Sequence, residues 1–276
     1  MRQGTGEPMT NTQTPAPKGR ALVTGAGKRL GRAMALYLGQ RGYDVAVHYA
    51  TAQSQAEAVA AEIRGMGRKA VALPADLLDE TQTSALVGQA HTALDGPLTV
   101  LINNASIFEY DTLDSASLES WDRHIGSNLR APFVLTQHFA KSAPEAAVDA
   151  QGEPIATGLI VNMIDQRVRK LTPEFMTYTL AKMGLWALTQ TAAQALAPRI
   201  RVNAIAPGPT MQGARQSDNH FARQRAGTVL QRGANPEDIT AALGYLLDAP
   251  AVTGQLFCVD GGQHLGWKTP DIVGVE

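Results

Sequence analysis

Two side chains that could transfer a proton, the Tyr178 phenol and the Lys182 ammonium, lie four residues apart in the sequence. The segment 174–197 around them has a helical pattern, and four residues make about one turn, so both side chains should share one face. A nearby positive charge favours the phenolate, so we expect Lys182 to lower the pKa of Tyr178. Such a tyrosine could exchange a proton with a substrate oxygen. A lone pair of this kind is common by chance, so its significance depends on the rest of the chain.

A glycine-rich turn near the start of the chain could bind a phosphate. The apolar run 21–23 predicts a strand, the segment 24–31 predicts a turn, and the pattern through Leu38 predicts a helix. Backbone N–H groups in such a turn can approach a pyrophosphate, and the helix N-terminus adds a favourable dipole. The turn therefore indicates a dinucleotide site, with expected cofactor contacts from Gly25, Gly27, Lys28, Arg29, Leu30 and Gly31.

The end of the next predicted strand, 44–49, bears on which nicotinamide cofactor binds. A site that prefers NADH usually places a carboxylate there to bind the ribose hydroxyls. The segment 48–51 has no acidic residue, whereas Lys28 and Arg29 could meet a 2′-phosphate, unless they are only solvated charges. We therefore predict NADPH as the cofactor, in contact with His48, Tyr49 and Ala50.

Strands and helices alternate along the whole chain, and this order predicts the fold. The later predicted strands are 69–73, 98–102, 159–163, 200–205 and 255–259, and the helices are 53–66, 79–94, 115–141, 174–197 and 235–247. Pro132 should bend or divide the third of these helices. The pattern predicts an α/β fold: a doubly wound parallel sheet of about seven strands, a single Rossmann-type domain. Its ligands should bind at the carboxyl ends of the strands, where the polar motifs collect.

Composition and the remaining segments limit the classes of protein. The 276 residues are 44% hydrophobic and 18% charged, with a net charge of -1, which favours a globular protein without nucleic acid or membrane partners. Cys258 is the single cysteine, so no internal disulfide forms, and the scattered histidines predict no metal site. No apolar run is long enough to span a bilayer.

The chain should consist of a disordered tail and one domain. Residues 1–18 lack the apolar core of a secretion signal, which makes the cytoplasm the expected location. Residues 19–276 should form the domain. Within it, 142–157 is expected to be an irregular surface loop, and the polar segment near 209–233 a mobile substrate loop over the cleft.

Together these motifs resemble the short-chain dehydrogenase/reductase family over about residues 20–265. The matching positions are the turn 24–31, Asp76, Asn103-Asn104-Ala105, Asn128, Tyr178 with Lys182, Pro207-Gly208 and Asp260-Gly261-Gly262. The resemblance implies that Asp76 contacts the adenine, Asn104 lines the cofactor channel and Lys182 binds the nicotinamide ribose. Asn128 would hold a water in the proton relay to Tyr178. It also implies a homotetramer and cofactor contacts from Leu77, Ala105, Ser106, Pro207, Gly208 and Thr210.

Asp165 departs from the common pattern of that family. A serine usually stands thirteen residues before the tyrosine and donates a hydrogen bond to the substrate carbonyl, and here that position is Asp165. An ionised aspartate cannot donate and would repel an oxyanion, so it suits a substrate that carries N–H donors or a ring nitrogen to be protonated.

The pteridine reductase branch of the family resembles this chain more closely. It has the aspartate, a Thr-Gly-x-x-x-Arg-x-Gly turn, matched by 24–31, and an Asn-Asn-Ala-Ser-x-Phe motif, matched by 103–108. By this resemblance Arg29 and Ser106 hydrogen-bond the pterin or the cofactor phosphate, and Phe108 stacks on the pterin. The branch often has an arginine after the second strand, and this chain has Ala50-Thr51 there.

We therefore predict an NADPH-dependent reductase of a C=N bond in a pterin-like substrate, either a dihydropterin or dihydrofolate. One alternative is a carbonyl or 3-oxoacyl reductase of the same family, against which Asp165 argues. The other is a regulator that senses NADPH without chemistry, against which an intact proton relay argues. The predicted catalytic residues are Asp165, Tyr178, Lys182 and Asn128, and the predicted substrate contacts are Arg29, Ser106, Phe108, Asp165 and Tyr178.

Overall fold

The computed structural model describes residues 16–213, 216–269 and 273. Most of the predicted tail, 1–15, therefore lies outside the described residues. At its inner end the Lys18 N–H donates to the Gly42 carbonyl at 3.0 Å, so this end is already tied to the domain.

A seven-stranded parallel sheet forms the centre of the molecule, in the order β3-β2-β1-β4-β7-β8-β9. This confirms the predicted doubly wound fold. The strand order reverses between β1 and β4, and in such sheets ligands bind at the carboxyl ends beside this point. The strands are β1 Gly19–Val23, β2 Tyr43–Tyr49, β3 Ala70–Pro74, β4 Val100–Asn103, β7 Gly158–Met163, β8 Ile200–Pro207 and β9 Leu256–Val259.

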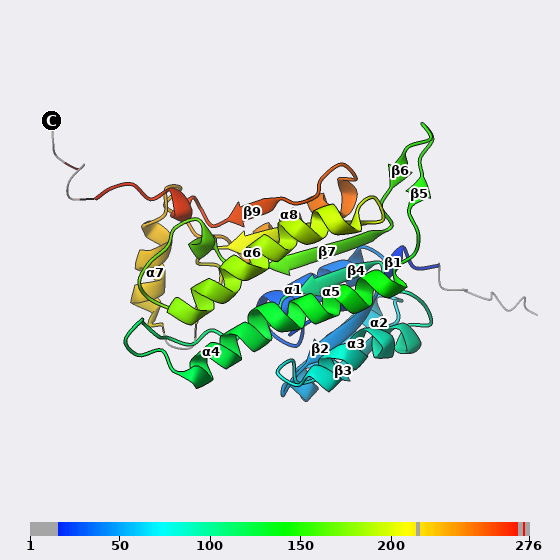
Figure 1. The fold of residues 1–276 in the computed structure, drawn as a ribbon, viewed down its shortest axis with the longest axis horizontal. Helices are drawn as coiled ribbons and strands as arrows, with labels where there is room; N and C mark the ends of the chain where they lie inside the picture. Colours follow the sequence, from blue (N-terminus) through cyan, green and yellow to red (C-terminus); the bar gives the residue numbers. More distant parts are fainter. Residues whose placement is uncertain (1–15, 214–215, 270–272, 274–276) are drawn as a thin grey trace, which may run out of the picture.

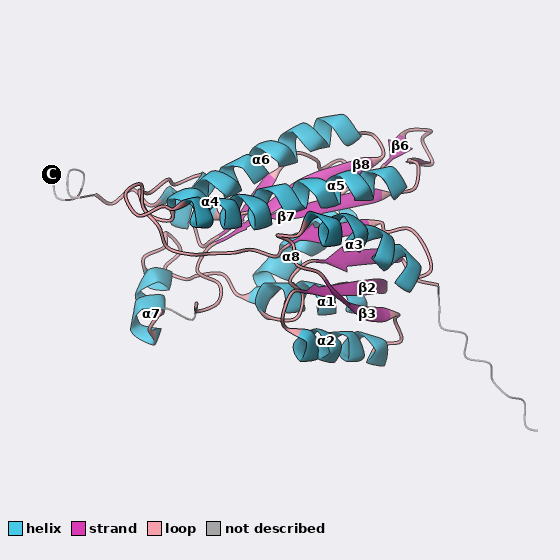
Figure 2. Cartoon of the chain, turned by 60° about the horizontal axis from the view of Figure 1, so that its bottom comes forward, coloured by secondary structure: helices cyan, strands magenta, loops and turns pink. Residues whose placement is uncertain are grey.

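Helices cover both faces of this sheet (Figures 1 and 2). On one face lie α1 (Arg29–Gln40), α2 (Gln53–Gly65) and α8 (Pro236–Asp248). On the other lie α3 (Glu80–Ala93), α5 (Ala131–Ser142) and α6 (Met176–Leu196). Two shorter helices, α4 (Leu118–Ile125) and α7 (Asp218–Ala226), lie near the end of the molecule where the strands finish (Figure 1).

The apolar strand sequences follow from this double cover. In β1, Ala21 and Val23 pack in the core on the α1 side, whereas Leu22 packs in the core on the α3 side. All three side chains are completely buried. Because both faces of the sheet are covered, the strand reads as a continuous apolar run rather than an alternating one.

The predicted helix 115–141 is broken, but before Pro132 rather than at it. Helix α4 begins after its N-cap Ser117, and a π-helical turn, Gly126–Arg130, separates it from α5. Pro132 lies in the first turn of α5. Proline has no N–H to bond the carbonyl four residues earlier, that of Asn128, and a widened turn accommodates this loss.

Two segments that lack a clear pattern in the sequence contain regular structure. The expected loop 142–157 includes an antiparallel pair, β5 Ala147–Val148 and β6 Pro154–Ile155. The expected mobile loop 209–233 includes helix α7, which begins after its N-cap Ser217. Both elements are short, so their periodicity is too brief to detect in the sequence.

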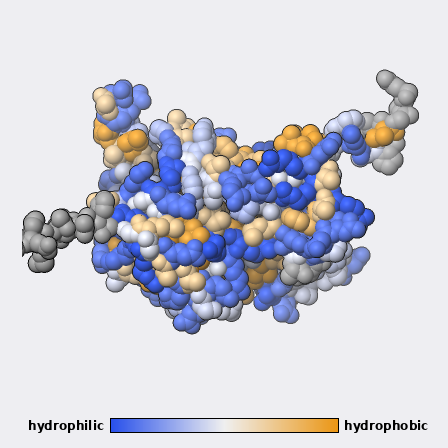
Figure 3. Space-filling view, turned by 180° about the vertical axis from the view of Figure 1, so that it is seen from behind, coloured by the Kyte–Doolittle hydropathy of each residue, from blue (hydrophilic) through white to orange (hydrophobic). Residues whose placement is uncertain are grey.

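Within the described residues, no helix has the length and apolar character needed to span a bilayer. On the face shown in Figure 3, hydrophilic and apolar residues are interspersed.

Candidate active site

Two adjoining cavities open at the carboxyl edge of the sheet. The first has a volume of about 540 Å³ and the second of about 760 Å³. Arg29, Gly208 and Met211 line both, so the two are continuous. Volumes of this size are typical of sites for cofactors and small substrates.

The glycine turn lines the first cavity and packs tightly against the end of β4. Asn104 Nδ2 donates to the Thr24 carbonyl at 2.8 Å, and the Thr24 hydroxyl accepts from the Asn104 and Ala105 N–H groups at 2.9 Å each. A Cβ at Gly31 would lie 2.2 Å from the Gly25 carbonyl oxygen. Only glycine fits there, and where Gly25 and Gly27 line the cavity a phosphate could approach the backbone of the turn.

His48 supports this turn from the side that faces away from the first cavity. Its Nδ1 accepts from the Gly25 N–H at 3.0 Å, and its Nε2–H donates to the Ala75 carbonyl at 3.0 Å. Because Nδ1 must accept, the two bonds together need the neutral ring with its proton on Nε2. Burial lowers the pKa of His48 to about 4, with the bond to Ala75 acting in the opposite direction. His48, predicted to touch the cofactor, therefore supports the turn and lies outside the lining of the first cavity.

Arg29 joins the two cavities. Its backbone adopts a left-handed conformation, with φ at 52°, which is uncommon for a residue other than glycine. Its guanidinium donates to the Met211 carbonyl at 2.9 Å and to the Gln212 carbonyl at 2.7 Å. The glycine turn is thereby tied to the beginning of the segment that leads to α7.

Most of the residues predicted to contact the cofactor line the first cavity. Four of the predicted residues that do not line it lie elsewhere in the fold. His48 supports the turn, Leu77 is buried in the core, and Pro207 lines the second cavity. Asp76 is exposed, and its carboxylate accepts from the Leu78 N–H at 2.9 Å, as a turn cap would. The predicted residues in the lining are Gly25, Gly27, Lys28, Arg29, Leu30, Gly31, Tyr49, Ala50, Asn104, Ala105, Ser106, Gly208 and Thr210.

The Tyr178 phenol is hydrogen-bonded to Asp165 and not to Lys182. Its hydroxyl donates to Asp165 Oδ2 at 3.0 Å, and Asp165 Oδ1 accepts from the Arg167 N–H at 2.8 Å. Lys182 Nζ donates to the Met163 carbonyl at 2.8 Å and lies 5.6 Å from the centre of the Tyr178 ring. Helix α6 thus brings the phenol and the ammonium to one face, while β7 and the residues that follow it supply the partner of each.

The expected lowering of the Tyr178 pKa is wrong for this arrangement. Burial and the neighbouring Asp165 carboxylate raise the pKa of Tyr178 well above 10, and Arg167 and Ser106 oppose this only in part. Burial also raises the pKa of Asp165 and lowers that of Lys182 to about 8. Burial and the Asp165 charge therefore dominate the pKa of Tyr178, and Asp165 holds a proton more readily than an ordinary aspartate does.

Asn128 supports the loop after β4 that carries Phe108. Asn128 is completely buried in the π-helical turn, and its side chain bonds Ile107 twice, from the Ile107 N–H at 2.9 Å and to the Ile107 carbonyl at 2.8 Å. Phe108 is 48% exposed and lines the second cavity. The side chain of Asn128 therefore fixes the segment that presents the Phe108 ring, and its contact with a water stays a prediction.

A second aromatic ring, Phe175, escaped the sequence reasoning. It stacks on Phe108 with ring centres 4.4 Å apart and planes within 6°, and the Arg167 guanidinium lies 4.7 Å from its centre. Its position three residues before Tyr178 was the one feature of the sequence that could have indicated a ring at this site. Its left-handed backbone, with φ at 55°, has no signature in the sequence. Other lining residues without a signal in the sequence are Tyr110, Gln166 and Gln263. The segment 209–233 contributes Gln216, His220, Phe221 and Gln224 to the lining of the second cavity.

Comparison with known proteins places this chain among reductases. The family model described as Enoyl-(Acyl carrier protein) reductase matches residues 25–264. The 3-oxoacyl-[acyl-carrier-protein] reductase FabG of Staphylococcus aureus is 33% identical over 250 residues, covering 89% of this chain and 98% of that protein. The short-chain dehydrogenase/reductase eriH of Hericium erinaceus is 32% identical over 256 residues, covering 89% and 98%.

The solved structures include a similar protein with a bound cofactor. FolM alternative dihydrofolate reductase 1 from Brucella suis, crystallised with NADP, is 42% identical, with a TM-score of 0.86 over 93% of this chain and 99% of that one. The match to the family model, the identity to the curated relatives and this structural likeness agree, so the chain belongs to the short-chain dehydrogenase/reductase family of oxidoreductases.

Proposed function

We propose that this protein is an NADPH-dependent reductase of a C=N bond in a pterin-like substrate, a dihydropterin or dihydrofolate. The observation that carries the proposal is the bond between Tyr178 and Asp165 beside the exposed ring of Phe108. Its support from relatives is the FolM enzyme of Brucella suis, crystallised with NADP.

The first cavity fits the phosphates of NADPH. Gly25 and Gly27 present no side chain to this cavity, and the exposed Lys28 and Arg29 side chains add positive charge. The end of β2 presents Tyr49, Ala50 and Thr51 to this cavity, without a carboxylate to repel a 2′-phosphate. When bound, NADPH supplies a hydride to the carbon of the C=N bond.

Asp165 then supplies the proton that the ring nitrogen takes up. Its raised pKa favours the protonated carboxyl, which can donate to nitrogen. The Tyr178 hydroxyl that donates to Oδ2 can then relay a proton to the carboxylate, taking up one from water as it gives its own, so that no phenolate remains. The Phe108 ring, backed by Phe175, offers a flat apolar face for the heterocycle. Because the protonated form is the active one, the rate should fall as pH rises through the raised pKa of Asp165.

The test is NADPH oxidation by the purified protein with dihydrobiopterin, dihydromonapterin, dihydrofolate and a panel of ketones. Asp165→Asn keeps the shape of the side chain but cannot transfer a proton, and it should lower kcat/KM for the pterin by about 10²–10⁴-fold. Asp165→Ser should abolish pterin reduction as well. Turnover of ketones alone, unchanged or improved in Asp165→Ser, would overturn the proposal.

A carbonyl or 3-oxoacyl reductase is the second candidate. It is favoured by the 33% identity to FabG and by the raised pKa of Asp165, because a protonated carboxyl could donate to a carbonyl oxygen as serine does. The same substrate panel distinguishes the two. A regulator that only senses NADPH would bind the cofactor and turn over neither class.

A further inference from the structure

A buried polar cluster lies beside the two cavities without lining either of them. Its members are Asp111, His124 and Thr177, which are 2%, 0% and 2% exposed. They come from the loop after β4, from α4 and from the first turn of α6. Polar groups buried this deeply cost free energy unless they are bonded, so their bonds show what the cluster holds together.

The hydrogen bonds fix the protonation state of His124. The Thr177 hydroxyl donates to Asp111 Oδ2, so its oxygen must accept from His124 Nδ1–H, at 2.7 Å. His124 Nε2 then accepts from the Glu109 N–H at 3.1 Å. The ring is therefore neutral, with its proton on Nδ1. Burial lowers the pKa of His124, with Asp111 opposing, in agreement with a neutral ring.

One arm of the cluster runs from His124 Nδ1 through Thr177 to Asp111 and ends at the start of α6. This helix carries Tyr178 and Lys182 and is the catalytic helix. Among the described residues, the N-cap position of α6, Phe175, supplies no side-chain cap. Asp111 supplies the cap from 66 residues upstream, because its Oδ1 accepts from the Thr177 N–H at 3.2 Å and its carbonyl from the Phe175 N–H at 2.8 Å. A carboxylate at this end is also favoured by the helix dipole. The next residue of this first turn is Tyr178.

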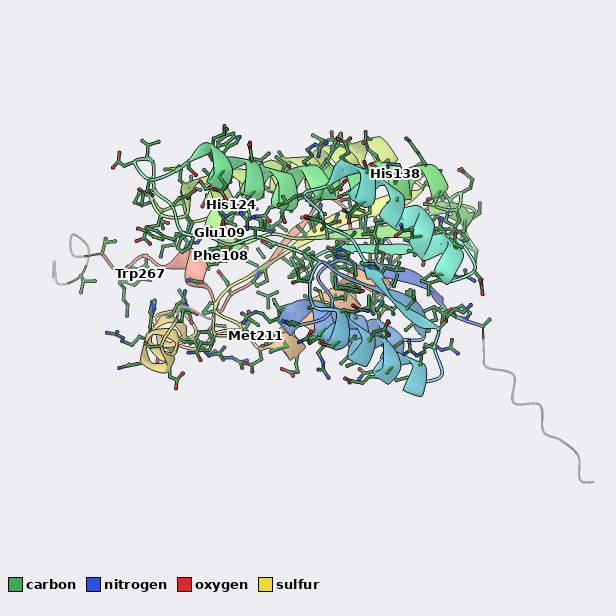
Figure 4. All side chains as sticks on the ribbon, turned by 90° about the horizontal axis from the view of Figure 1, so that it is seen from below. Phe108, Glu109, His124, His138, Met211 and Trp267 are labelled. Atoms are coloured by element: carbon green, nitrogen blue, oxygen red, sulfur yellow. The ribbon has the colours of Figure 1, made fainter. Side chains whose placement is uncertain are left out.

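The other arm is the hydrogen bond from the Glu109 N–H to His124 Nε2, and it ends at the loop that carries Phe108. His124 holds Glu109, Asn128 holds Ile107, and Phe108 lies between these two anchored residues. Figure 4 shows Phe108, Glu109 and His124 together at this end of the molecule. The Tyr178 ring lies between the two arms. Its centre is 4.7 Å from the centre of the Phe108 ring and 5.9 Å from that of the His124 ring.

We propose that His124 is a positioning residue that sets the catalytic helix through Thr177 and the Phe108 loop through Glu109. Neither role requires contact with the substrate. The helix arm concerns Tyr178 and applies to any substrate of the enzyme, whereas the loop arm rests on the proposed function, in which Phe108 holds a pterin. The two arms use different ring nitrogens, so they can be separated by substitution.

Two substitutions each keep one arm. In His124→Asn the amide nitrogen lies near the place of Nδ1 and can still donate to Thr177, but nothing accepts from Glu109. In His124→Gln the amide reaches the place of Nε2 and can accept from Glu109, but the bond to Thr177 is lost. Each variant should also lower Tm, as loss of a buried bond does.

The expected kinetic constants differ between the variants. His124→Asn should raise KM for the dihydropterin about tenfold and leave kcat within about twofold, because the ring clamp loosens. His124→Gln should lower kcat about tenfold with little change in KM, because Tyr178, which relays the proton to Asp165, shifts. The Kd of NADPH, measured by fluorescence, should stay near the wild-type value in both.

A milder pair tests the helix arm should the histidine variants fail to fold. Thr177→Ser keeps the hydroxyl and should retain wild-type kcat, whereas Thr177→Val keeps the shape and should lower kcat about tenfold. Lower Tm with unchanged kcat and KM in all these variants would overturn the proposal, as would equal losses in His124→Asn and His124→Gln. If the wild type reduces ketones but no pterin, the proposed function fails, and kcat on the ketone still decides the helix arm.

Discussion

Replacement of His48 by asparagine should make the stability of this protein less sensitive to acid. The native structure needs the neutral ring, because Nδ1 accepts from Gly25 and Nε2–H donates to Ala75. The amide side chain in His48→Asn would keep an acceptor for the Gly25 N–H and could not titrate. At pH 7 the substitution should cost about 1 kcal/mol for the lost bond to Ala75.

The magnitude follows from the pKa of His48, which burial lowers from 6.5 to about 4. Above pH 6.5 the ring is neutral in both the folded and the unfolded chain, so it adds no pH dependence. Below 6.5 the unfolded chain binds the proton first, so the free energy of unfolding falls until pH reaches about 4. The loss amounts to about 2 kcal/mol at about pH 5 and about 3 kcal/mol well below about pH 4.

Urea unfolding of the wild type and of His48→Asn at about pH 7.5, 6 and 5 measures this loss. Burial also lowers the pKa of His91 and His124, so both proteins keep some acid sensitivity, and the difference between them isolates His48. His138→Asn is a matched control, because His138 lies partly exposed on α5, away from the glycine turn (Figure 4). Equal losses across this pH range in wild type and His48→Asn would refute the reasoning.

Three further predictions concern the cofactor site and the assembly. Gly31→Ala should raise the Kd of NADPH more than about tenfold, because the new Cβ would lie 2.2 Å from the Gly25 carbonyl oxygen. Gly88→Ala, whose Cβ would meet no atom within 4 Å, is its control, and an unchanged Kd for Gly31→Ala would contradict the tight turn. Lys28→Ala should raise KM for NADPH about tenfold and leave KM for NADH nearly unchanged; equal effects on both would remove Lys28 from the 2′-phosphate. Light scattering should give a mass four times that of the 29.3 kDa chain, as expected for a homotetramer.

Much of the fold follows from signals that are local in the sequence. Apolar strands alternating with amphipathic helices predict the parallel sheet, since only covered strands can be apolar on both faces. Asp79 precedes α3 and caps it, accepting from the Thr81 and Gln82 N–H groups. The glycine turn also follows from residue type, because position 31 accommodates only a glycine. These features depend on neighbours in the chain.

The short elements show where local signals fail. Helix α7 and the pair β5 and β6 are too brief for periodicity to reveal, and the break before α5 depends on how the π-helical turn accommodates Pro132. The cap of α6 by Asp111 joins residues 66 apart, so no pattern near Tyr178 could indicate it. The left-handed backbone of Phe175 is likewise a result of this junction.

The chemistry of the site was decided by the tertiary structure. The sequence determined that Tyr178 and Lys182 share a helical face and that Asp165 follows a strand, which predicts one polar site at the sheet edge. The reductase activity expected there came from the resemblance of the whole set of motifs to a known family. It could not determine that the phenol donates to Asp165, that Lys182 turns to the Met163 carbonyl, or that His48 lies behind the glycine turn. A pKa depends on burial and on the nearest charge, and both are set by residues that the fold brings together from distant parts of the chain.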